Sequence, residues 1–286
     1  MLAPGTANPE DRSAAIYLRA VVVLLAVVVA VVSGCLLVAS AAGFPPGAAP
    51  RRGQGAYAWM PVAGVVAATQ MMVFVTVAGA VRPGYDVDRN WVSQLSIGPG
   101  GWQGTANLAS CGLWLIVCAA GLGSRLGPDG AARWAVRLVR CCGAGLVVLA
   151  IVPTDPGLGY PPGVPSVYTA TGAAHQLVSA LLGFCAIVAA ALLGRCLRDT
   201  GVAWARPAGL VVAAGMAVVL VAASVLVVLD ADGVLPGTPS GLLERVALFA
   251  GLGWIAVVGT ALLVTGGAPG SARQPGAAPE AALRDR

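Results

Sequence analysis

Seven long apolar segments set the main limit on what this chain can fold into. Each approaches or exceeds the roughly 20 residues that an α-helix needs to cross the hydrocarbon core of a bilayer. In that core a chain has to satisfy its own backbone hydrogen bonds, so the segments predict helices. We therefore expect an all-α fold, a polytopic transmembrane helix bundle with seven helices at residues 16–42, 58–81, 102–123, 134–152, 167–194, 207–229 and 246–265.

The composition agrees with a chain that lies mainly in the membrane. Of the 286 residues, 58% are hydrophobic and 10% are charged, whereas soluble domains contain roughly 25% charged residues. The net charge of +5 comes from arginines that lie mostly between the apolar segments. Basic residues in such a chain are mainly topology signals, so no nucleic-acid partner is expected.

The placement of the arginines predicts the orientation. The connections after the first, third and fifth segments and the C-terminal tail hold most of them, so the positive-inside rule places the N-terminus outside and the C-terminus in the cytoplasm. Cleavage of the first segment as a signal peptide would reverse this arrangement, and we expect the segment to be retained. The predicted organisation is a flexible tail at 1–15, a transmembrane helix at 16–42, six further transmembrane helices within 58–265 and a disordered cytoplasmic tail at 266–286.

Acidic residues gather in the connections that are predicted to lie outside. These connections run over residues 82–96, 153–168 and 230–245, and their acidic residues are Asp86, Asp88, Asp155, Asp230, Asp232 and Glu244. The connections predicted on the cytoplasmic side hold fewer carboxylates. Any polar chemistry is therefore expected on the outer face.

The only histidine lies close to the same face. His175 falls about two turns into the fifth predicted helix, and Ser179 follows four residues later on the same helical face. An ionisable side chain at this depth is costly in lipid, so it should face the bundle interior or a water-filled cavity. His175 is then either a functional group or a structural one, bonded to a backbone carbonyl or a serine of a neighbouring helix.

Four sequence features, taken in order, resemble a known family. They are RPGYDVDRNWVSQLS after an apolar helix, a helix ending in IVPTDPG, a helix that opens with the histidine of AAHQLVSALLGF, and the segment LLERVALFAGLGWIAVVG. Over about residues 58–265 they resemble the bacterial and archaeal membrane family called domain of unknown function 998 (DUF998). The resemblance implies a six-helix membrane domain at 58–265, to which the helix at 16–42 is an addition. The resemblance implies a multi-pass protein of a bacterial cell membrane and no established reaction. The first loop of the family usually reads Ser-Glu-Leu, whereas this chain has Gln94 at the glutamate position.

The polar residues near the predicted outer mouth form one candidate site. A carboxylate beside His175 would favour the imidazolium and fix its tautomer, which gives a pair able to transfer a proton. We expect Asp155, His175 and Asp86 in the catalytic role. The expected substrate-binding residues are Tyr85, Asp88, Arg89, Ser93, Ser179, Glu244 and Arg245.

Each carboxylate also has a structural explanation. Asp155 in TDPG fits a turn in which it bonds its own backbone, and Asp86 and Asp88 fit a solvated loop. Several carboxylates and one histidine are compatible with a divalent metal, but the chain has no HExxH and no paired histidines. We therefore expect no metal and no cofactor.

Three classes of function remain open. The first is an enzyme that acts on a lipid, isoprenoid or similar amphiphile by acid–base chemistry at the outer mouth. The second is a small permease or exporter, although the sequence has no evident inverted repeat. The third is a noncatalytic membrane component that binds a lipid or a partner protein. The expected partners are membrane lipids and a hydrophobic small-molecule substrate, and the oligomeric state is left open.

Overall fold

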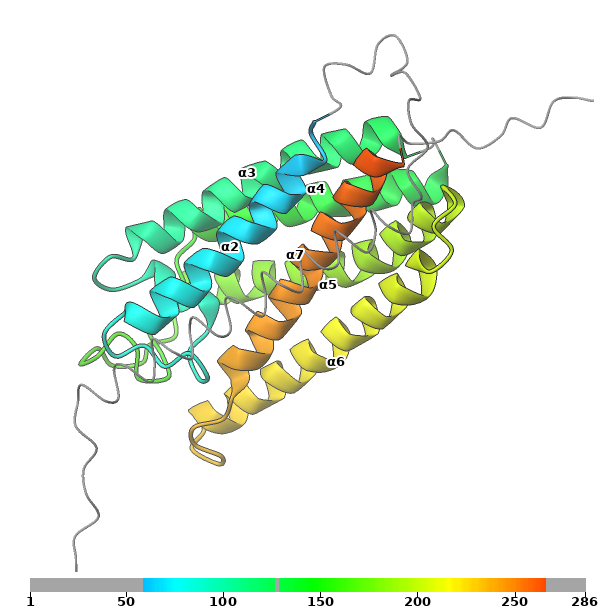
Figure 1. Ribbon diagram of the computed structural model, residues 1–286. Helices are drawn as coiled ribbons and strands as arrows, with labels where there is room; N and C mark the ends of the chain where they lie inside the picture. Colours follow the sequence, from blue (N-terminus) through cyan, green and yellow to red (C-terminus); the bar gives the residue numbers. More distant parts are fainter. Residues whose placement is uncertain (1–58, 127–128, 266–286) are drawn as a thin grey trace, which may run out of the picture.

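The computed structural model describes residues 59–126 and 129–265, and within them the chain is an all-helical bundle (Figure 1). All six long helices are apolar enough to cross a membrane, so the predicted multi-pass architecture is confirmed for these six. The predicted helix at 16–42 and both predicted tails lie outside the described residues. The long helices are α2 (Val62–Val81), α3 (Trp102–Arg125), α4 (Gly130–Ile151), α5 (Ala170–Asp199), α6 (Ala205–Ala231) and α7 (Ser240–Val264), and a 3-10 helix, η2 (Val92–Ser96), lies between α2 and α3.

The helices form a closed ring in chain order. Each long helix packs against the next one along the sequence, and α7 returns to pack against α2. In Figure 1 the helices run side by side along one common direction, with α6 at the edge of the bundle. Inside the ring, α7 also contacts α5 and α3.

Two helices begin four or more residues earlier than the hydropathy pattern predicts. α4 begins at Gly130, because the carboxylate of Asp129 accepts the N–H of Ala132 at 2.6 Å and caps the helix. α7 begins at Ser240 and not at residue 246, so Glu244 lies within the helix that was expected to follow it. A hydropathy pattern ends a predicted helix at its polar residues, even where these residues have hydrogen-bond partners inside the protein.

Burial is uneven around the ring. About half of the most apolar stretch is buried in α2, α3 and α7 (50% each), against 22% in α5 and 17% in α6. Large apolar side chains of α5 and α6, such as Phe184 and Val218, are therefore left at the outer surface. In a membrane this surface faces hydrocarbon, and α5 and α6 form the side of the bundle that is most open to lipid.

Glycine pairs let two helix pairs meet through their backbones. A Cβ on Gly112 of α3 would lie 2.5 Å from the carbonyl oxygen of Gly143 of α4, and the reverse distance is 2.6 Å. Gly194 of α5 and Gly209 of α6 meet in the same way, with a Cβ on Gly194 only 3.0 Å from the Gly209 Cα. Such close approach is a common device for packing helices in membranes.

We expect Gly112→Ala to lower the stability of the bundle by about 1–3 kcal/mol, because the added methyl group overlaps the backbone of α4 and forces the helices apart. The measurement is the midpoint of thermal unfolding of the purified protein in mild detergent. The matched control is Gly215→Ala in α6, where nothing lies within 4 Å of the added Cβ. Equal midpoints for the two variants would contradict the assigned role of the Gly112 contact.

Candidate functional site

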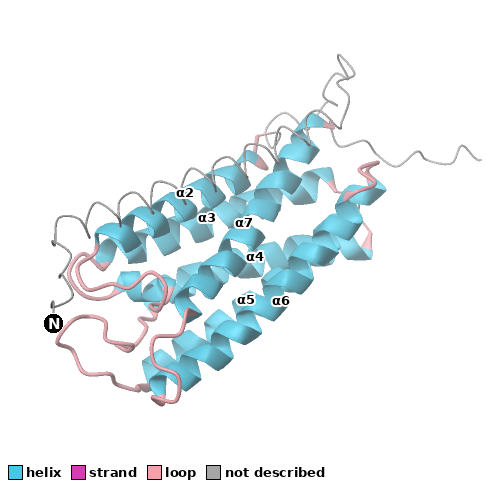
Figure 2. Ribbon diagram, turned by 60° about the horizontal axis from the view of Figure 1, so that its bottom comes forward, coloured by secondary structure: helices cyan, strands magenta, loops and turns pink. Residues whose placement is uncertain are grey.

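The long connections gather at one end of the bundle, which we call the loop end (Figure 2). The loop end consists of residues 82–101, 152–169 and 232–239, which join α2 to α3, α4 to α5 and α6 to α7. These segments include most of the polar residues singled out in the sequence. Their side chains fall into separate groups, which are described in turn.

Arg245 binds the first connection to the beginning of α7. Its buried guanidinium donates through Nη1 to the carbonyl oxygens of Val87 at 2.7 Å and Asn90 at 2.9 Å. The same nitrogen donates to the Gly241 carbonyl at 2.8 Å, and Nη2 donates to the hydroxyl of Tyr85. Charge-assisted bonds of this kind are the stronger hydrogen bonds in proteins. Arg245 thus acts within the loop end and is not available to a ligand.

Tyr85 packs its buried ring beside Arg245 in the same cluster of side chains. Its ring lies edge-on to Tyr160, with 5.2 Å between the ring centroids. The hydroxyl donates to the carbonyl oxygens of Asn90 at 3.1 Å and Trp91 at 2.9 Å. Burial raises the pKa of Tyr85 well above its ordinary value. The phenol therefore remains a neutral hydrogen-bond donor that folds the connection on itself.

Asp86 and Asp88 face away from the bundle. Both are exposed, and Asp86 Oδ1 accepts the backbone N–H groups of Asp88 at 3.0 Å and Arg89 at 3.3 Å. The Asp86 N–H donates in turn to the side chain of Asn90 at 2.8 Å. This is the pattern of a loop in which aspartate bonds its own backbone.

Arg89 is paired with Asp230 at the end of α6. Nε and Nη2 of Arg89 bind the two carboxylate oxygens at 2.8 and 2.6 Å, and the Asp230 side chain is fully buried. The Thr238 N–H also donates to this carboxylate, at 3.1 Å. The hydrogen bond to Asp230 raises the pKa of Arg89. The pair ties the first connection to the α6–α7 connection.

Asp155 forms part of the cap of α5. Its two carboxylate oxygens accept the backbone N–H and the hydroxyl of Thr169, each at 2.7 Å. Thr169 is the N-cap residue, and its hydroxyl oxygen accepts the Gly172 N–H at 3.0 Å. A Cβ at Gly172 would overlap the Asp155 carboxylate. The TDPG turn and the start of α5 are therefore built as one unit.

His175 is buried, with 2% of its surface exposed, and binds the end of α4. Its Nδ1 lies 2.7 Å from the carbonyl oxygen of Val152. Because a carbonyl only accepts, Nδ1 carries the proton, and Nε2 has no partner among the described residues. Within the described chain no hydrogen bond joins His175 to Asp155, so the proposed proton-transfer pair is not assembled in this arrangement.

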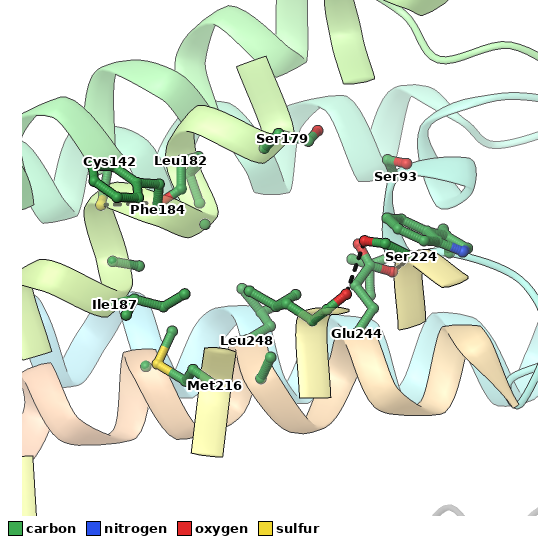
Figure 3. A pocket seen from close by; sticks show the side chains of 18 of the residues that line it. Ser93, Cys142, Ser179, Leu182, Phe184, Ile187, Met216, Ser224, Glu244 and Leu248 are labelled. Atoms are coloured by element: carbon green, nitrogen blue, oxygen red, sulfur yellow. Dashed lines mark hydrogen bonds between the residues drawn. The ribbon is translucent and has the colours of Figure 1, made fainter. Parts of the chain in front are cut away.

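A cavity of about 740 Å³ lies inside the bundle and is lined by residues of all six helices and of the first connection. Most of the lining side chains are aliphatic, and most of the lining residues come from α5, α6 and α7 (Figure 3). Toward one end Figure 3 shows Met216, Ile187 and Cys142. Toward the other end it shows Ser93, Ser224 and Glu244. The cavity is thus apolar along its length and polar at the loop end.

Among the described residues that line the cavity, Glu244 is the only charged one. It projects from the second turn of α7, and its Oε2 accepts the backbone N–H of Val92, the first residue of η2, at 2.6 Å. Gln176 and Ser179 of α5 add neutral polar groups to the lining. The polar end therefore combines one carboxyl group with amide and hydroxyl groups.

The exposure of lining side chains on α5 and α6 indicates that the cavity opens sideways between these two helices. Several of its lining side chains are also among the most exposed large apolar residues, including Phe184 at 64% and Val221 at 65%. Gln176 and Ser224 both line the cavity and are exposed, so the part of this opening nearest the loop end is polar. The two helices touch through backbone at Gly194 and Gly209, beyond the other end of the cavity.

The structure brings together only part of the predicted site. Ser93, Ser179 and Glu244 line the cavity, whereas the other seven predicted residues do not. Sequence reasoning missed Gln176 and Ser224. Both are polar residues inside apolar helices, which is the signal that would have identified them. Among the described residues, no three histidine, cysteine, aspartate or glutamate side chains gather closely enough to hold a metal ion.

Gln94, where the chain departs from the Ser-Glu-Leu pattern, bridges two connections. Its Nε2 donates to the Gly157 carbonyl at 2.8 Å, and its Oε1 accepts the Trp91 N–H at 3.0 Å. The side chain is buried. An amide makes both bonds, whereas a carboxylate makes only the second.

We expect Gln94→Glu to destabilise the protein by about 1–3 kcal/mol, because a carboxylate oxygen would then face the Gly157 carbonyl with no proton between them. The thermal midpoint in detergent measures the effect. The penalty should shrink at acid pH, where a protonated carboxyl again donates. Gln103→Glu makes the same change at an exposed site in α3 and serves as the control. A Gln94 variant as stable as this control at neutral pH would refute the assigned bridge.

Comparison with known proteins gives one match. The family model described as "Protein of unknown function (DUF998)" matches residues 65–261, which include nearly all of the six described long helices. No curated protein and no solved structure matches the chain. The matched region covers more than half of the sequence and confirms the resemblance drawn from the four sequence features. The chain belongs to the DUF998 family of proteins of unknown function.

Proposed function

We propose that this protein binds one amphiphile from the membrane, with the apolar chain in the cavity and the polar group at the loop end. The observation that carries the proposal is the cavity of about 740 Å³, which is aliphatic over most of its length and polar at one end. Its volume falls within the roughly 300–1,000 Å³ of ligand-binding pockets. An amphiphile is the class of molecule whose own polarity matches this lining.

The opening between α5 and α6 supports entry from the bilayer. Phe184, Val221 and Val225 line the cavity and are also exposed on the surface that faces hydrocarbon. A lipid chain can pass between these side chains without leaving an apolar environment, while its polar group moves past Gln176 and Ser224. No aqueous passage through the bundle is needed for this route.

Acid–base chemistry, if the protein performs it on such a ligand, would fall to Glu244. It is the one ionisable side chain of the polar end that lines the cavity, and its Oε1 has no hydrogen-bond donor among the described residues. Asp155 and His175 are hydrogen-bonded to residues of the α4–α5 connection and do not line the cavity. The geometry therefore favours binding as the primary function.

Photolabelling of the full chain in lipid nanodiscs tests the proposal. The probe is hexadecanol with a diazirine in its chain, and bound probe is located by peptide mass spectrometry. We expect saturable labelling of α5, α6 and α7 at the cavity, which excess hexadecanol competes away. Ala217→Phe should weaken this labelling at least tenfold, because Ala217 of α6 lines the cavity and the larger ring fills it.

Ala214→Phe is the matched control. Ala214 lies three residues earlier on α6, is exposed, and does not line the cavity. This variant should bind the probe like the unmodified protein. Labelling that never saturates, or that Ala217→Phe and Ala214→Phe reduce equally, would show contact with the outer surface and refute binding in the cavity.

A further inference from the structure

We propose that the cavity selects amphiphiles whose headgroup donates a hydrogen bond and carries no negative charge, such as a long-chain alcohol or amine, and that Glu244 is the residue that receives this headgroup. The inference rests on the proposed function and narrows its ligand class. It follows from which charges line the polar end of the cavity and which are kept away from it.

Glu244 has one carboxyl oxygen in use and one available. Oε2 accepts the Val92 N–H at 2.6 Å, while Oε1 has no donor among the described residues. The side chain lines an otherwise uncharged cavity. A carboxylate in such surroundings is costly unless a donor or a cation pairs with it. A headgroup that brings an O–H or an N–H to Oε1 supplies the missing partner.

No cation of the loop end lines the cavity. The described arginines at this end are Arg82, Arg89 and Arg245, and none of them is in the lining. Arg82 donates to the carbonyl oxygens of Leu95 and Gly100 at 3.2 and 3.1 Å. Arg89 is paired with Asp230, and Arg245 is bonded to backbone carbonyls and to Tyr85.

An anionic headgroup would therefore meet repulsion without compensation. A phosphate or carboxylate beside Glu244 places two like charges in a site of low polarity, which is strongly unfavourable. The remaining polar lining side chains, Ser93, Gln176, Ser179 and Ser224, are neutral. Discrimination by repulsion is as effective a source of specificity as added attraction.

A hydroxyl headgroup and an ammonium headgroup would bind Glu244 in different ways. A hydroxyl both donates and accepts, so one O–H group can donate to Glu244 and accept from a neutral polar side chain of the lining, such as Gln176. An ammonium group only donates, and its binding is strengthened by the attraction between its positive charge and the Glu244 carboxylate.

Three probes with the same diazirine-bearing hexadecyl chain test the inference in nanodiscs of neutral lipid. They differ only in the headgroup, which is a hydroxyl, a primary amine or a phosphate monoester. With the unmodified protein we expect saturable cavity labelling by the alcohol and the amine, and a half-saturating concentration at least tenfold higher for the phosphate. This comparison needs no substitution, so it holds even where a variant fails to fold.

Glu244→Gln identifies the residue responsible. The amide keeps an oxygen for the Val92 N–H but removes the charge. We expect the half-saturating concentration of the amine to rise about tenfold, that of the alcohol to change less than threefold, and discrimination against the phosphate to weaken. Asp232→Asn removes an exposed carboxylate that does not line the cavity, and it should leave all three values unchanged.

The outcomes separate the two proposals. If no probe labels the cavity saturably, the proposed function itself fails. If all three probes bind the unmodified protein equally, or the phosphate binds best, amphiphile binding stands and the headgroup assignment is overturned. If Glu244→Gln and Asp232→Asn shift the amine equally, the selectivity arises from surface charge and Glu244 is not its source.

Discussion

The guanidinium of Arg245 is the interaction on which the loop end depends. It gathers carbonyl oxygens from the first connection and from α7 around one buried charge, and Ser240 and Glu244 of α7 each add one hydrogen bond to the same connection. Successive residues of a helix point about 100° apart. With Arg245 turned toward the connection, its neighbour Glu244 is turned toward η2 and the cavity. The same contact thus closes the end of the bundle and sets the direction of its one cavity-lining carboxyl group.

The sequence was a good guide to the helices and a weaker guide to where they begin. Long apolar segments identify α2 to α7 because the bilayer thickness imposes their length. The start of α7 at Ser240 escaped this reasoning. Hydropathy treats Glu244 and Arg245 as loop residues, because the scale assumes that water is the only hydrogen-bond partner of each side chain. The partners that Glu244 and Arg245 have inside the protein exist only in the folded bundle.

The site was less predictable for a related reason. Asp155 and His175 drew attention because ionisable groups are rare in this chain, yet each is hydrogen-bonded to a residue of the α4–α5 connection. Ser93, Ser179 and Glu244 meet at the cavity from η2, α5 and α7, and only the order of helices around the ring brings them together. Residue type indicates which groups are costly to bury, whereas the fold decides which of these groups lie where a ligand can reach them.

The backbone contact of α5 with α6 fixes the spacing of these helices beyond the apolar end of the cavity. Gly194 and Gly209 leave no side chain to move aside, and Trp254 of α7 adds a hydrogen bond to the Ala190 carbonyl of α5 at 3.0 Å. From Gln176 to Ile187 the cavity lining extends roughly 16 Å along α5, at about 1.5 Å per residue, and Gly194 follows about 10 Å further along the helix. A separation of α5 from α6 would therefore be smallest beside the two glycines and would grow toward the loop end, where the polar lining residues lie.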